Sequence, residues 1–187
     1  ILEIDGKKYN TANAVRKAIT GKVGDPVVLK IKRGSDKKDI KVIRGKIEDS
    51  TVEPTSISDK IGYVKITSFG ENTAKKFEEA INSFESNGKE SVIIDLRSNP
   101  GGYFDEGTKV ADRILPKCKI TYTKDKHGNI KNFNSDEKHT KLKVILLIDE
   151  NSASASEIVA SALIDNGAAI SVGQKTFGKG IVKETRL

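Results

Sequence analysis

The sequence predicts an α/β protein whose layered core follows a smaller α+β unit. Short apolar runs alternate with amphipathic stretches of helical period over most of the second half of the chain. Such alternation is typical of a parallel sheet built with right-handed crossovers. Residues 45–58 contain Pro54 and few apolar side chains, which indicates a connector. We therefore expect a first unit over residues 1–46, a linker over 47–58 and a core domain over 59–187.

The first unit is expected to combine strands with one helix. Residues 1–4 are typical of a strand that ends in an Asp-Gly turn. Thr11 is placed to cap a helix that stops at Gly21. Residues 27–32 alternate as a strand, and residues 40–43 return as its hairpin partner.

The core domain shows a longer series of elements. A helix that starts at Asn72 or Thr73 carries an apolar stripe and closes at an Asn-Gly pair. The run at 92–96 is almost continuously apolar, as expected for a strand buried on both faces. Further strands are expected at residues 61–66, 120–123, 130–133, 144–148 and 169–172, and further helices at residues 104–115 and 155–166.

Composition excludes several classes of function. The formal net charge of +7 is spread along the chain, and no basic cluster with interleaved aromatic residues appears, so nucleic-acid binding is not expected. One cysteine, Cys118, allows no intramolecular disulfide. No apolar run approaches the roughly 18 residues of a membrane span, and no signal peptide is present. The chain opens directly on a strand and stops abruptly at Leu187, which suggests a fragment.

Residues 149–157 lie between a predicted buried strand and a predicted helix, and they carry three serines. Ser154 would stand at the helix N-terminus, where free backbone N–H groups and the helix dipole favour developing negative charge. A nucleophilic serine fits this position. A plain helix cap fits it equally well, because Ser154 and Glu157 have the spacing of a capping box.

Lys179 lies between two glycines in a Phe-Gly-Lys-Gly segment. A lysine in this setting is usually part of a surface turn. It can also enter a tight site, where burial lowers its pKa and lets it act as a general base. A Ser/Lys pair requires such a lysine, because a solvated lysine stays protonated and cannot accept the serine proton.

Residues 95–102 run from a predicted buried strand into a Pro-Gly-Gly turn. The amides of Gly101 and Gly102 could hold an oxyanion at the carboxyl end of the sheet, although an ordinary turn explains the same residues. His127 and His139 both lie in a polar stretch, which argues against a Ser/His triad. Neither a metal-ligand spacing nor a phosphate-binding loop is present, so no metal or nucleotide site is expected.

Taken in order, three motifs resemble those of the C-terminal processing (tail-specific) serine proteases. They are Asp-Leu-Arg-Ser-Asn-Pro-Gly-Gly at 95–102, Glu-Asn-Ser-Ala-Ser-Ala-Ser-Glu at 150–157 and Thr-Phe-Gly-Lys-Gly at 176–180. The resemblance implies a ClpP/crotonase-like core preceded by the C-terminal part of a PDZ domain. It also implies proteolysis without a cofactor.

By the same resemblance, Ser154 is the nucleophile and Lys179 is its general base. The oxyanion hole is expected from the Ala155 amide and one amide of the Gly101–Gly102 pair. The implied partners are protein substrates with accessible C-termini, which the PDZ domain would recognise. The family works outside the cytoplasm in bacteria, and the resemblance leaves open membrane association of the parent protein, a homo-oligomer or an activating partner.

One position departs from the family pattern. Lys183 stands where the family usually has a glutamine whose side-chain oxygen helps to hold the catalytic lysine. A lysine offers only donors and cannot accept that hydrogen bond. We therefore expect weaker orientation of the base. A non-catalytic homologue with a PDZ domain, acting as a peptide-binding or scaffold protein, is the alternative.

Overall fold

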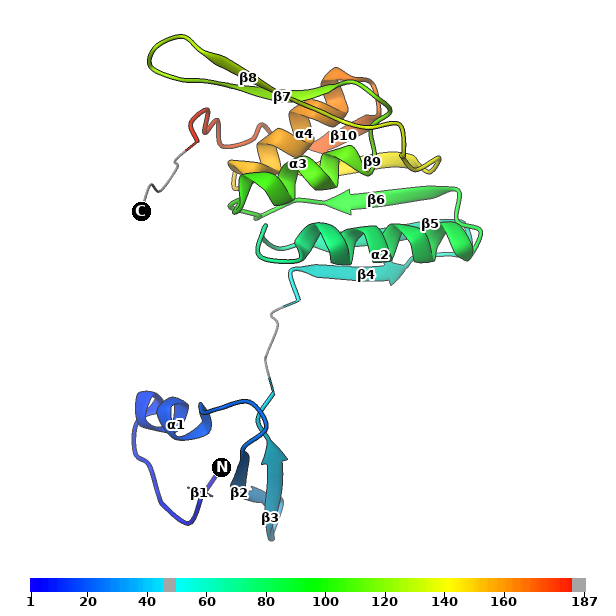
Figure 1. Cartoon of the computed structure of the whole chain (residues 1–187). Helices are drawn as coiled ribbons and strands as arrows, with labels where there is room; N and C mark the ends of the chain where they lie inside the picture. Colours follow the sequence, from blue (N-terminus) through cyan, green and yellow to red (C-terminus); the bar gives the residue numbers. More distant parts are fainter. Residues whose placement is uncertain (46–49, 183–187) are drawn as a thin grey trace. The chain divides into compact units, whose positions relative to one another are not determined.

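The computed structural model describes residues 1–45 and 50–182. The chain divides into two units, Ile1–Asp49 and Ser50–Leu187, which Figure 1 shows in blue and in cyan to red. Each unit is described by itself. Within the described residues, no helix is long and apolar enough to cross a membrane.

Unit 1 is a small antiparallel sheet with one helix. Its elements are β1 (Glu3–Ile4), α1 (Ala12–Ile19), β2 (Pro26–Arg33) and β3 (Asp36–Ile43), and the sheet order is β1-β2-β3. The Ala14 amide donates to the Thr11 hydroxyl at 3.2 Å, which confirms the predicted cap. Among the described hydrophobic residues of this unit, only Ile4 and Val27 are buried, so its core is slight.

Unit 2 is an α/β layer. Its elements are β4 (Val52–Ser56), β5 (Ile61–Ile66), α2 (Thr73–Ser86), β6 (Ser91–Asp95), α3 (Phe104–Asp112), β7 (Lys119–Lys124), β8 (Ile130–Asn134), β9 (Lys143–Ile148), α4 (Ala155–Asp165) and β10 (Ala169–Gly173). In the described part, the main sheet has the order β10-β9-β6-β5-β4, and β7 and β8 form a separate hairpin. Four of its strands are parallel, and β4 is antiparallel to β5.

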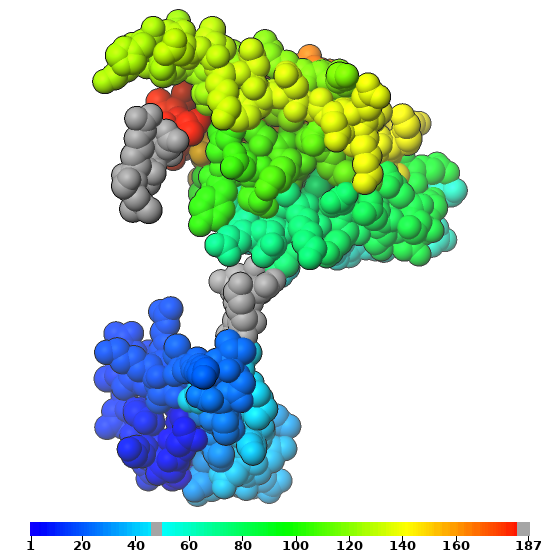
Figure 2. Space-filling view, viewed as in Figure 1, coloured from blue at the N-terminus to red at the C-terminus, as the bar shows by residue number. Residues whose placement is uncertain are grey.

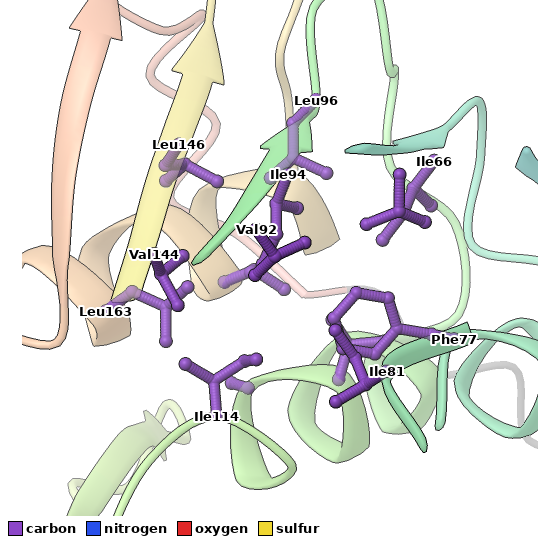
Figure 3. Packing of buried hydrophobic residues seen from close by; sticks show 14 of the residues in the cluster. Ile66, Phe77, Ile81, Val92, Ile94, Leu96, Ile114, Val144, Leu146 and Leu163 are labelled. Carbon is purple, nitrogen blue, oxygen red and sulfur yellow. The ribbon is translucent and has the colours of Figure 1, made fainter. Parts of the chain in front are cut away.

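The core of unit 2 lies between the sheet and its helices. Because β5, β6, β9 and β10 follow one another across the sheet in one direction, right-handed crossovers place α2, α3 and α4 on the same face. Figure 3 shows Ile94 of the sheet on the side of Phe77 and Ile81 of α2, and Val144 of the sheet beside Leu163 of α4. Every one of these side chains is almost completely buried.

Three expectations need correction. Residues 52–56, expected within the linker, form the edge strand β4, and Val52 is buried in the core of unit 2. The helix expected to reach residue 115 ends at Asp112. β6 alternates rather than being buried throughout, because Val92 and Ile94 are buried while Ile93 is half-buried. The parallel core and its helices are otherwise as predicted.

Candidate active site

The carboxyl ends of β6, β9 and β10 lead into three loops that converge on one cavity. Its volume is about 860 Å³, and its lining includes Gly102, Ser154, Ala155 and Lys179. Ligand sites of open parallel sheets form at this edge, because the loops that follow neighbouring strands meet there. Figure 2 shows the red end of the described chain beside the yellow-green β7–β8 hairpin, which contributes Tyr122 to the lining.

The structure distinguishes the three serines of residues 152–156. The Ser152 hydroxyl donates to the Leu96 carbonyl at 2.8 Å, and the Ser156 hydroxyl donates to the Asn99 carbonyl at 3.0 Å. Both serines have an exposed fraction of 0%. Ser154 is half-buried and lines the cavity. It is therefore the serine of this motif that a substrate can reach.

Ser154 has a strained backbone. Its φ of 58° and ψ of −115° lie in a region that a residue with a side chain rarely adopts. Such a conformation costs on the order of 1–3 kcal/mol and persists only where the surroundings impose it. The Ser154 amide donates to the Glu157 carboxylate at 2.8 Å, and the Glu157 amide donates to the Ser154 carbonyl at 2.9 Å. The capping-box prediction is thus confirmed for the carboxylate, and capping and exposure to the cavity occur together.

The two glycines of the Pro-Gly-Gly turn are not equivalent. The Gly101 amide donates to the side-chain oxygen of Asn99 at 2.9 Å, and Gly101 is buried against the Ser154 turn. Gly102 lines the cavity. In the described part of the chain, the amides of Gly102 and Ala155 donate to no acceptor. These two N–H groups are therefore available to a ligand, whereas that of Gly101 is not.

Asn99 joins the glycine turn to the serine turn. Its side-chain amide donates to the Ile66 carbonyl at 2.7 Å, and its backbone carbonyl accepts from the Ala153 amide and the Ser156 hydroxyl, each at 3.0 Å. Asn99 lies within the motif at 95–102, but the sequence predicted no role for it. Its burial, with an exposed fraction of 0%, could not be read from a loop position beside a proline.

Asp95 is a buried, hydrogen-bonded residue at the end of β6. It pairs with Arg97 at 2.7 Å and accepts from the Tyr63 hydroxyl at 2.7 Å. Burial alone would raise the pKa of Asp95, but the hydrogen bonds from Arg97 and Tyr63 outweigh it and hold that pKa below its usual range. Asp95 does not line the cavity, so the Asp-Leu-Arg part of the motif supports the strand end rather than the cavity wall.

The segment that carries Lys179 is attached to α4 through Glu157. The Thr176 hydroxyl and the Gly178 amide donate to one carboxylate oxygen at 2.9 and 2.6 Å, and the Lys179 amide donates to the other at 2.9 Å. The sequence interpretation treated Glu157 only as a helix-capping residue. Burial would raise the pKa of Glu157, but these hydrogen bonds and that from Ser154 lower it overall.

The side chain of Lys179 differs from expectation. A general base was expected to be buried, yet Lys179 is exposed at the rim of the cavity. Its neighbours Gly178 and Gly180 are exposed as well, and a Cβ added at either would meet open space. Lys183, the expected departure from the family pattern, lies outside the described residues.

The two histidines lie away from the cavity. His127 belongs to the turn between β7 and β8, and the ring nitrogens of His139 are hydrogen-bonded to the exposed residues Glu137 and Lys141. Neither ring lines the cavity. In residues 1–45 and 50–182, no group of three or more His, Cys, Asp or Glu side chains is arranged to hold a metal ion.

Comparisons with known proteins agree on one family. A family model described as peptidase family S41 matches residues 60–187. A probable CtpA-like serine protease of Staphylococcus haemolyticus is 40% identical over the whole chain, and its counterpart in Staphylococcus aureus strain COL is 35% identical. The chain spans only 38% of the length of each of these relatives.

Solved structures show the same fold. The photosystem II D1 C-terminal processing protease superposes with a TM-score of 0.68 at 24% identity, over 97% of this chain and 52% of that one. A putative S41 protease from Bacteroides fragilis NCTC 9343 gives a TM-score of 0.58 at 16% identity, over 95% of this chain and 54% of that one. The mixed α/β fold of this chain is therefore shared with S41 protease structures.

Proposed function

The chain belongs to peptidase family S41, and from this premise we propose that it carries the catalytic core of a serine endopeptidase that cleaves proteins near their C-termini. Ser154 would be the nucleophile and Lys179 the general base. One observation carries the proposal: the strained, accessible Ser154 shares a cavity with two unpaired backbone amides and with Lys179.

The chemistry is an acyl transfer in two halves. Neutral Lys179 would accept the hydroxyl proton of Ser154 while the serine oxygen bonds to the scissile carbonyl carbon. The C–N bond then breaks, and protonated Lys179 gives its proton to the leaving amine. In the second half, Lys179 takes a proton from water, the water oxygen displaces the serine oxygen, and Lys179 returns the proton to Ser154.

The Ala155 and Gly102 amides fit the role of an oxyanion hole. Backbone N–H groups stabilise a tetrahedral oxyanion when they are fixed beforehand and have no other acceptor. Gly102 and Ala155 meet that condition, whereas Gly101 is paired with Asn99. We therefore prefer Gly102 over Gly101 as the second donor.

An exposed lysine needs a further step before it can act as a base. Lys179 lies at the rim of a cavity that a polypeptide would fill. A bound substrate would withdraw the amine from water, and desolvation favours its neutral form. Under this proposal, the base becomes competent as substrate binds.

The rest of the proposal concerns architecture and substrate. The unit 2 core would be of the ClpP/crotonase-like type, and unit 1 would be the C-terminal part of a PDZ domain that recognises substrate C-termini. The helix and antiparallel sheet of unit 1 are consistent with this assignment. Protein substrates with accessible C-termini would be the partners.

Replacement of the two reacting residues tests the proposal. Ser154→Ala and Lys179→Ala should each reduce cleavage of an unstructured peptide with a free C-terminus by at least about 10³-fold, because each removes a group that moves a proton or forms a bond. Cleavage is followed by mass spectrometry, and circular dichroism checks folding. The controls Ser171→Ala and Lys143→Ala change exposed residues outside the cavity and should retain activity. Undiminished cleavage by either site variant would contradict the assignment.

A non-catalytic peptide-binding or scaffold protein is the second candidate. The exposure of Lys179 favours it, because a lysine that acts as a general base is expected to be buried. Titration of the full chain with a fluorophosphonate separates the two. Stoichiometric labelling of Ser154 supports the peptidase, whereas peptide binding without labelling supports the scaffold.

A further inference from the structure

One carboxylate connects the two halves of the candidate active site. In the described part of the chain, Glu157 accepts four hydrogen bonds: from the Ser154 amide, the Thr176 hydroxyl, the Gly178 amide and the Lys179 amide. One carboxylate oxygen, Oε2, accepts from both Ser154 and Lys179, at 2.8 and 2.9 Å. The backbones of the proposed nucleophile and base are therefore each one hydrogen bond away from the same atom.

A capping role for Glu157 does not account for this arrangement. A capping box asks of the Glu157 carboxylate only that it accept from the Ser154 amide. The other three donors come from residues 19 to 22 positions further along the chain, beyond the end of α4. They hold a different segment.

We propose that Glu157 is a positioning residue that fixes the backbone of Lys179 relative to that of Ser154. The inference rests on the proposed function of those two residues. It also offers an answer to the sequence departure at Lys183. A lysine there cannot accept a bond from Lys179, so the orientation of the base would come from the backbone, through Glu157.

The number of acceptors explains why the residue is a glutamate. An ionised carboxylate offers about four lone-pair sites and no donor, which matches four incoming donors. A glutamine offers one oxygen, and its NH₂ group would face N–H donors. Hydrogen bonds to a charged acceptor are also about twice as strong as neutral ones. The lowered pKa of Glu157 keeps the carboxylate ionised near neutral pH.

The first experiment measures the attachment without relying on activity. Amide hydrogen exchange of the full chain is compared among the wild type, Glu157→Gln and the matched control Glu150→Gln. Glu150 is exposed and makes no side-chain hydrogen bond in the described part of the chain. Exchange of the Gly178 and Lys179 amides should rise at least tenfold in Glu157→Gln and stay unchanged in Glu150→Gln. Unchanged exchange in Glu157→Gln overturns the proposal.

The second experiment measures the consequence for the reaction. Glu157→Gln should lower kcat for peptide cleavage and the rate of fluorophosphonate labelling at Ser154 by about 10²-fold, with KM changed less than threefold. Thr176→Val removes one donor and leaves the carboxylate in place, so it should lower kcat only a few-fold. If Glu157→Gln fails to fold, Thr176→Val still measures whether hydrogen bonds to Glu157 affect catalysis.

The outcomes separate this inference from the proposed function. Faster amide exchange with unchanged kcat and labelling would overturn the positioning role while leaving the peptidase intact. A wild-type chain that neither cleaves nor labels would overturn the proposed function, and the positioning role with it, whatever the exchange data show. Faster exchange together with the loss of kcat supports both.

Discussion

The serine turn and the lysine segment of the candidate active site are held in different ways. The serine turn is fixed by buried side chains from several elements, with Ser152 bonded to Leu96 and Asn99 bonded to Ile66. The lysine segment, residues 176–180, is mostly exposed. Three of its hydrogen bonds end on the carboxylate of Glu157, and the Phe177 amide donates to the Ser152 carbonyl at 3.0 Å. Backbone that is exposed and weakly packed opens more readily than backbone in a core.

The difference shows how strain at a site can be maintained. Ser154 keeps an unfavourable backbone conformation because the buried residues on both sides of it leave no alternative. Lys179 has no positive φ, and it is exposed. One half of the candidate site is therefore held by buried residues in a strained conformation, and the other half is held at the surface.

The largest expected effect comes from a substitution at Gly101, which packs tightly against the serine turn. At Gly101 a Cβ would lie 2.5 Å from the Ala153 carbonyl oxygen, and φ is +95°. Gly101→Ala should lower the free energy of unfolding by about 3 kcal/mol or more, because strain and a backbone clash add. At Gly180 a Cβ would meet open space and φ is not positive. Gly180→Ala should therefore change the free energy of unfolding by about 0.5 kcal/mol or less. Urea unfolding measures both, and equal losses would remove the contrast.

A smaller effect tests the link between the glycine and serine turns. Asn99→Ala leaves the Ile66 carbonyl and the Gly101 amide without their buried partner. An unpaired buried polar group costs at least about 1 kcal/mol, so with two such groups the free energy of unfolding should fall by about 2 kcal/mol. The control Asn151→Ala changes an exposed asparagine in the same region. A loss of similar size in the control would show that Asn99 has no special part.

The smallest effect is a pH dependence at the groups that are hydrogen-bonded to Glu157. The pKa of Glu157 is lowered in the folded chain, so its attachment is complete above the ordinary value of about 4.3 and is lost as pH falls through the lowered value. Exchange protection of the Gly178 amide should fall in that acidic range. The Gly101 amide, which is bonded to the uncharged Asn99, should lose less.

Glu157→Gln provides the control for the pH series. With no titrating carboxylate at residue 157, the acid-dependent loss of protection at Gly178 should disappear. Persistence of the same pH dependence in this variant would assign it to another group, such as Asp149, whose pKa is also lowered because hydrogen bonds from Ser98 and Asn151 outweigh its burial.

The strands and helices were largely predictable from the sequence, except for strand β4. Periodicity and turn residues located the helices and the parallel strands, because those signals are local. β4 was missed because Pro54 and a polar majority conceal it. Proline cannot donate to a sheet, but β4 is an edge strand and needs to bury only Val52. Only its position in the sheet shows that the segment is a strand.

The sequence indicated several residues that the structure places at one cavity, but not their hydrogen bonds or their exposure. Motif order indicated Ser154, Lys179, Ala155 and the glycine pair as candidates. It could not distinguish Gly101 from Gly102, since that choice depends on which amide Asn99 occupies. Nor could it reveal that the Lys179 side chain is exposed while Glu157 holds the Lys179 backbone.

The sequence by itself therefore determined most of the order of elements and indicated Gly102, Ser154, Ala155 and Lys179, which border the cavity, because both depend on short stretches of chain. The tertiary structure decided which serine is accessible and which amides are free. Those properties follow from pairings between distant segments, such as Ser152 with Leu96 and Ser156 with Asn99, 56 and 57 residues apart. Because Ser152 and Ser156 are hydrogen-bonded to these carbonyls, Ser154 is the serine left for a ligand. That difference arises only when the distant segments pack together in the folded chain.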